Sequence, residues 1–138
     1  MGTFHLPYPE FDSEQKIGFK NTLVFIGSCF SSNISQLSEN HGFNTLSNPF
    51  GTLFHPVPIL TGLQNAIRES KEVHYLDTPD FVSDWDSAHL LQSATKRTHL
   101  NLILEKRKAL RDALSGDAWL FVTFGTSIAY RHISSGRV

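Results

Sequence analysis

Two short apolar runs constrain the fold of this chain more than any other feature. The runs LVFI, residues 23–26, and AWLFVTF, residues 118–124, lack the polar alternation of a strand with one solvated face. Continuous apolar strands are typical of parallel sheets that helices cover on both sides. The sequence therefore predicts two strands of a parallel sheet, over 22–27 and 118–124, each buried on both faces.

Amphipathic helical patterns separate the predicted strands. The first helix ends at Gly42, which suits a left-handed cap, and its apolar face lies opposite a serine-rich face. That apolar face consists of Phe30, Ile34 and Leu37. A second helix, with proline from Pro56-Val57-Pro58 in its first turn, is predicted to continue to Ile67, and a third is predicted over 100–114.

The remaining segments complete a plan for one domain. Residues 42–56 predict a short strand and a loop with proline and glycine, and residues 71–95 predict a loop with a short edge strand at 81–82. Strands that alternate with helices imply βαβ units, so the fold class is α/β: a three-layer α/β/α arrangement with a mainly parallel sheet. We predict an extended arm over 1–21 and one domain over 22–138.

The charge balance and the single cysteine narrow the possible partners. The chain has 138 residues, with 12 Lys and Arg against 13 Asp and Glu, so no basic field attracts nucleic acid or an anionic membrane. The N-terminus lacks a signal-peptide pattern, and no apolar run approaches the roughly 20 residues that cross a bilayer. One cysteine excludes an internal disulfide and a cysteine-rich zinc site, and it suits a reducing compartment. We therefore expect a cytoplasmic protein without nucleic-acid or membrane partners; the oligomeric state stays open.

Small polar residues follow both predicted strands. Gly27-Ser28-Cys29 follows the first strand and Gly125-Thr126-Ser127 follows the last. The carboxyl ends of parallel strands lie along one edge of a sheet, where ligands bind, so the two turns are expected to share a cleft. Cys29 would lie in the first turn of its helix, where free N–H groups and the helix dipole favour an anion. The alternative is purely structural, because Ser caps helices, Gly turns chains and a lone cysteine is often an inert buried residue.

Three sequence blocks carry a resemblance to a known family. The stretch FIGSCFSSNI, residues 25–34, is followed by GFNTLSNPFGTLFHPVPI, residues 42–59, and by TFGTS, residues 123–127. Together they resemble the GSCFA family, whose five-residue motif reads GSCFS here, and a weaker block matches Trp85, His89 and Ser93. That family resembles a distant branch of the SGNH, or GDSL-like, hydrolases. The resemblance implies a three-layer α/β/α enzyme that cleaves esters or transfers acyl groups on small-molecule substrates, without a cofactor.

The resemblance also implies roles for individual residues. Cys29 aligns with the nucleophile, and a slip of one residue would give that role to Ser28. Seven residues are implied in oxyanion or substrate binding: Gly27, Asn48, Gly51, Gly125, Thr126, Ser127 and His89. The third block departs from the hydrolase pattern, because Ser127 stands where an oxyanion-binding Asn is expected. A non-catalytic module that binds a small acyl, carboxylate or phosphate ligand is therefore the alternative function.

Other ionisable groups are weaker candidates. The Asp and His of such hydrolases come from a late block that these 138 residues do not match, so we expect an N-terminal part of the domain that is weakly active or inactive alone. His89 and His132 are the local substitutes, although a surface position is the simpler interpretation of both. Asp84, Asp86 and His89 lack a second ligand cluster and are interpreted as a solvated loop rather than a metal site. The basic run 105–108 is interpreted as the solvated face of the third helix.

Overall fold

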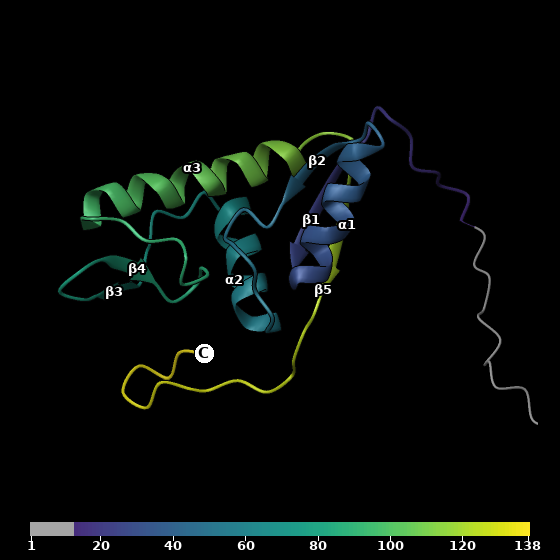
Figure 1. Ribbon diagram of the computed structural model, residues 1–138. Coiled ribbons are helices and arrows are strands. Elements are labelled where there is room, and N and C mark those ends of the chain that lie inside the picture. The colour runs from purple at the N-terminus through teal and green to yellow at the C-terminus, as the bar shows by residue number, and fades with distance from the viewer. Residues whose placement is uncertain (1–12) are drawn as a thin grey trace, which may run out of the picture.

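The computed structural model describes residues 13–138 and contains a small parallel sheet. Three strands form it in the order β2-β1-β5, and both neighbouring pairs are parallel (Figure 1). Their bounds are Thr22–Gly27 for β1, Asn44–Ser47 for β2 and Ala118–Thr123 for β5. The predicted α/β class and the parallel pairing are confirmed.

Helices cover both faces of the sheet. The three helices are α1, Cys29–Asn40, α2, Pro56–Ile67, and α3, Lys96–Leu114. Val24 and Ile26 of β1 join one apolar core with residues of α2 and α3, among them Ile59 and Leu110. Since side chains alternate along a strand, Leu23 and Phe25 point to the opposite face, where α1 lies (Figure 1). The central strand is therefore buried on both faces, as its continuous apolar sequence predicts.

The prediction that the last strand is buried on both faces is wrong for this chain. β5 pairs with β1 along one side only and is an edge strand of the sheet. Leu120 and Val122 are 42% and 37% exposed, whereas Phe121 stacks on Phe25 with ring centroids 4.8 Å apart. An apolar run indicates that a strand tends to be buried. How many strands and helices pack against it depends on the tertiary structure.

The face that α1 turns to the sheet also differs from the prediction. Its buried residues are Ser31 and Ser35, while Phe30 and Leu37 are 59% and 53% exposed. The small serines let the helix approach the sheet, and the Ser31 hydroxyl shares a 2.8 Å hydrogen bond with Thr123 Oγ1. Gly42 follows the helix with a φ of +90°, as expected of a left-handed cap.

The segment between α2 and α3 contains more structure than the predicted edge strand at 81–82. An antiparallel hairpin forms from β3, Tyr75–Asp77, and β4, Val82–Asp84. α3 begins at a capping box in which Thr95 and Thr98 exchange side-chain and backbone hydrogen bonds. Within 13–138, no helix is both long and apolar enough to cross a bilayer. The predicted arm lies partly outside the described residues; residues 13–21 contain no helix or strand.

Candidate functional site

The ends of β1 and β5 lie side by side at one edge of the sheet. Gly27 is paired with Thr123 in the parallel register. Gly27 has a φ of +139°, and a Cβ at this position would lie 1.9 Å from the Thr123 carbonyl oxygen. The first glycine of the motif is thus required because only a residue without a side chain lets the two strand ends approach this closely.

Ser28 and Cys29 differ sharply in their surroundings. Ser28 is 7% exposed; its N–H donates to Thr123 Oγ1 at 3.1 Å and its hydroxyl shares a 3.0 Å bond with the same oxygen. Cys29 is exposed and is the first residue of α1. The Ser28 side chain makes no capping bond to α1, and the first turn holds no acidic residue. The positive end of the α1 dipole therefore lies beside an accessible thiol. Neither a Ser28 capping bond nor an acidic side chain of the first turn occupies the N–H groups there.

Asn48 connects three parts of this edge. Its Oδ1 accepts from the Gly27 N–H at 2.7 Å, and its Nδ2 donates to the Ser32 hydroxyl of α1 at 2.7 Å. Its own N–H donates to the Phe25 carbonyl at 2.8 Å, and its φ of 40° is in the left-handed region. Both ends of the Asn48 amide are therefore occupied by protein groups, and in this structure the residue positions the β1 turn.

The predicted oxyanion donors of the other two turns are also occupied. The Gly51 N–H donates to the Asn48 carbonyl at 2.8 Å. The N–H groups of Gly125 and Thr126 both donate to the Phe54 carbonyl, at 2.9 and 3.2 Å. A hydrogen that already bonds a backbone carbonyl is not available to a substrate without a local rearrangement. In this structure the three N–H groups close turns. The expected oxyanion or substrate-binding role of Gly51, Gly125 and Thr126 stays a prediction, and it requires these bonds to open.

Steric crowding explains why glycine occupies positions 51 and 125. Gly51 has a φ of +78°, and a Cβ there would lie 2.5 Å from Ala88 Cβ. A Cβ on Gly125 would lie 2.6 Å from the Phe54 ring. Leu53, next to Phe54, donates to the Gly27 carbonyl at 2.9 Å, so one short loop contacts the ends of both strands.

The remaining candidates lie on exposed chain. Ser127, His89 and His132 are all exposed, and the His132 ring lies 5.0 Å from that of Trp85. His132 Nδ1 shares a 2.8 Å bond with Ser135. Among residues 13–138, no histidine forms a hydrogen bond with Cys29 or Ser28, so no described histidine is in contact with the thiol as a base.

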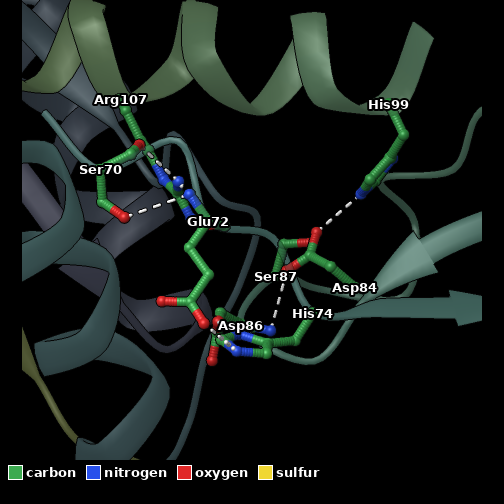
Figure 2. A network of polar contacts seen from close by, with 8 residues as sticks. All are labelled: Ser70, Glu72, His74, Asp84, Asp86, Ser87, His99 and Arg107. Carbon is green, nitrogen blue, oxygen red and sulfur yellow. Dashed lines mark hydrogen bonds and ion pairs between the residues drawn. The ribbon is translucent and has the colours of Figure 1, made fainter. Parts of the chain in front are cut away.

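A buried polar network under the hairpin was missed by the sequence interpretation. Asp84 Oδ2 accepts from His99 Nε2 at 2.7 Å and from the Ser87 hydroxyl at 2.7 Å, and Oδ1 accepts from the Asp86 N–H (Figure 2). Ser93 Oγ lies 3.3 Å from His99 Nδ1. Asp84 is therefore part of the interior, which corrects its interpretation as a solvated loop residue. Across the part of the chain that is described, no group of three His, Cys, Asp or Glu side chains is arranged to hold a metal.

Ser93, His99 and Asp84 contact one another in the sequence Ser–His–Asp, as in a serine-protease triad. Their burial indicates a structural role rather than a catalytic one. His99 has no exposed surface, and the Asp84 side chain is 3% exposed. Nucleophilic catalysis needs a substrate in contact with the hydroxyl and its base. The backbones of Ser93 and Val82 form two mutual hydrogen bonds, of 2.8 and 2.9 Å. The network therefore fastens the hairpin to α3.

Arg107 is the second buried charge that the sequence interpretation placed in solvent. It is 5% exposed, and its Nη1 donates to the carbonyls of Ser70 and Glu72, both at 2.8 Å (Figure 2). Burial lowers the pKa of the Arg107 guanidinium, and the carboxylates of Asp84, Asp86 and Glu72 partly oppose this shift. The signal was present in the sequence, because the buried face of α3 has helical spacing: His99, Ile103, Arg107 and Leu110.

An open groove lies at the other end of the sheet. It has a volume of about 880 Å³ and is lined by Asn21, Asp117 and Trp119, where β1 and β5 begin. The family motif and the exposed thiol instead lie where these strands end. We place the candidate site at the carboxyl edge, since ligands of parallel α/β sheets bind there.

These features define a class of protein: a parallel α/β domain with an accessible thiol at the carboxyl edge of its central strand. Comparison with family models assigns residues 22–138 to the GSCFA family. The chain belongs to that family, which confirms the resemblance carried by its three sequence blocks. Neither a curated protein nor a solved structure matches this chain.

Proposed function

We propose that the domain forms a covalent acyl intermediate on Cys29, as part of ester hydrolysis or acyl transfer. One observation carries the proposal: Cys29 is exposed at the first position of α1, while the Ser28 hydroxyl turns inward to Thr123. An accessible thiol at a helix N-terminus without a side-chain cap can reach a substrate and has backbone N–H donors beside it. This contrast favours Cys29 over Ser28 as the nucleophile.

The proposed step follows from this placement. The Cys29 sulfur attacks the acyl carbon and the carbonyl oxygen becomes an oxyanion, which the free N–H groups at the start of α1 stabilise. The S–C bond forms, the ester C–O bond breaks, and the alcohol leaves with a proton from the solvent or a general acid. Water or a second acceptor then takes the acyl group from the thioester and regenerates the thiol. The likeness of the family to SGNH hydrolases supports an ester as the substrate class.

A single experiment can measure acylation of Cys29 separately from catalytic turnover. The chain is incubated with short-chain nitrophenyl esters near pH 7, and nitrophenolate release is followed together with the mass of the intact protein. We expect one acyl group per chain, mapped to Cys29, formed about tenfold or more faster than on the urea-unfolded protein. Steady turnover requires a general base, which no described histidine supplies to the thiol.

Matched variants decide between the two nucleophiles. Cys29→Ala is expected to abolish the acyl adduct, whereas Ser28→Ala is expected to retain it, because the Ser28 hydroxyl is occupied by Thr123. Iodoacetamide labelling of the native protein provides an independent readout of thiol access. An adduct that persists in Cys29→Ala, or a Cys29 that reacts no faster folded than unfolded, contradicts the proposal.

A second function has its own supporting observation. The N–H groups of Gly51, Gly125 and Thr126 donate to backbone carbonyls, so the edge offers fewer free donors than an esterase of this type requires. A non-catalytic module that holds a small acyl, carboxylate or phosphate ligand at the start of α1 needs only the free helix N-terminus. Saturable ligand binding at Cys29 without formation of an adduct would favour this function.

A further inference from the structure

A small basic cavity lies between the end of α2 and the middle of α3, away from the thiol. Its volume is about 150 Å³, well below the roughly 300 Å³ or more of sites for whole drug-sized molecules. The side chains that line it include Ala66 and Glu69 at the end of α2, and Lys71, Leu104 and Arg107. A site of this size suits one small group rather than a complete substrate.

Cationic side chains outnumber acidic ones in the lining of the cavity. Four cationic residues line it: Lys71, Arg107, Lys108 and Arg111. Arg111 is paired with Glu69 at 2.7 Å, and Lys108 with Asp112. Two carboxylates thus neutralise two of the four cations. Lys71 and Arg107 form no ion pair with residues 13–138, although the carboxylates of Asp84, Asp86 and Glu72 lie close enough to interact electrostatically with the Arg107 guanidinium.

Arg107 is an unusual residue to leave unpaired. It is 5% exposed, it bonds only carbonyl oxygens, and its Nε is buried without a hydrogen-bond partner. A buried charge without a carboxylate partner is unfavourable, because no ion pair offsets its desolvation. The nearby carboxylates of Asp84 and Glu72 are bonded to His99 and His74 rather than to Arg107 (Figure 2).

The surroundings hold this guanidinium in place. The Nη1 bonds to the Ser70 and Glu72 carbonyls fix the plane of the guanidinium. A planar guanidinium with a fixed orientation is suited to the oxygens of a phosphoryl group. Exposed Lys71 can add a mobile second cation.

We propose that this cavity, bounded by Lys71, Arg107, Lys108 and Arg111, binds the phosphoryl dianion of inorganic phosphate or of a small phosphomonoester. The two cations that form no ion pair can bind the two negative charges of that group, and the volume of the cavity suits a single phosphoryl group. The site is separate from Cys29 and does not depend on thiol chemistry, so it goes beyond the proposed acyl-transfer function.

Titration calorimetry of the whole chain at constant ionic strength tests this site. Inorganic phosphate and glycerol 3-phosphate are both expected to bind saturably, and the tighter of the two identifies the source of the phosphoryl group. Acetate, with one negative charge, is expected to bind about tenfold more weakly or not at all. Acetate that binds as tightly as phosphate, or phosphate that shows no saturable binding, overturns the proposal.

Variants of exposed Lys71 and half-buried Lys106, neither of which belongs to the core, keep the test independent of folding. Lys71→Ala removes an ammonium group that forms no hydrogen bond or ion pair with residues 13–138, and it is expected to weaken phosphate binding about tenfold. Lys106→Ala removes a lysine from α3 that does not line the cavity, and it is expected to bind phosphate like the parent. If both variants lost phosphate affinity equally, phosphate would be attracted by the overall charge of the protein, and the proposed site would be wrong. Cys29→Ala is expected to bind phosphate unchanged, which separates this proposal from the proposed function.

Discussion

Gly27→Ala is expected to destabilise the whole domain, because the end of β1 leaves no room for a methyl group. In the present geometry the added Cβ would lie 1.9 Å from the Thr123 carbonyl oxygen and 2.7 Å from Thr123 Oγ1. The φ of +139° is a conformation that residues with a Cβ rarely adopt, and holding one there costs about 1–3 kcal/mol. Separating the strands would also break the bonds of the Ser28 N–H to Thr123, and an unpaired buried N–H costs about 1–3 kcal/mol.

Together these effects predict a loss of about 4 kcal/mol, a large part of the roughly 5–15 kcal/mol that stabilises a typical domain. The measurement is urea unfolding followed by tryptophan fluorescence, with Trp119 on the neighbouring strand as a reporter. Gly116→Ala is the matched control, since a Cβ there would meet nothing within 4 Å, and its effect is expected to stay within about 0.5 kcal/mol. If the two variants unfold within about 1 kcal/mol of each other, the steric reasoning about the motif glycine is refuted.

Three other predictions test interactions away from β1. Asp84→Ala leaves His99 buried without its partner and is expected to cost about 3–5 kcal/mol in urea unfolding; a loss below about 1 kcal/mol would contradict a structural role for the pair. Thr95→Ala removes the cap of α3 and is expected to cost about 1 kcal/mol in the same assay, whereas an unchanged midpoint would argue against the cap. The hydrogen bond to Asp77 raises the pKa of Lys96 above its ordinary value of 10.5, so its stabilising effect is complete below pH 10.5 and is lost as the pH rises through the higher folded-state pKa. Asp77→Asn should return the Lys96 pKa toward 10.5 in an NMR titration, and a pKa that stays raised would exclude Asp77 as its cause.

Some properties of the candidate site follow from its own short stretch of sequence, and others depend on distant segments. Gly27, Ser28 and Cys29 follow a predicted buried strand, and the motif was sufficient to place a thiol at a helix N-terminus. Whether each side chain faces solvent was not local, because the Ser28 hydroxyl turns to Thr123, a residue 95 positions away in the sequence. The contrast between a buried serine and an exposed cysteine therefore appears only when β5 is paired with β1.

The buried ionisable groups illustrate the same distinction. Arg107 stands in a run of charged residues, and composition alone favours a solvated helix face. Its position at helical spacing from His99, Ile103 and Leu110 indicates the inward face, and this periodic signal outweighs the local charge. The carbonyls that make its burial tolerable belong to Ser70 and Glu72, which no pattern around Arg107 reveals.

The sequence by itself determined the α/β class, the central strand, the three helices and the family of this chain, because apolar periodicity and the motif residues are local properties. Only the tertiary structure decided that β5 is an edge strand, that serines form the buried face of α1, and that the turn glycines donate to carbonyls. These outcomes depend on which distant segment supplies the neighbouring atoms. Burial and hydrogen-bond partners are properties of pairs of segments, and pairs form only when the chain folds.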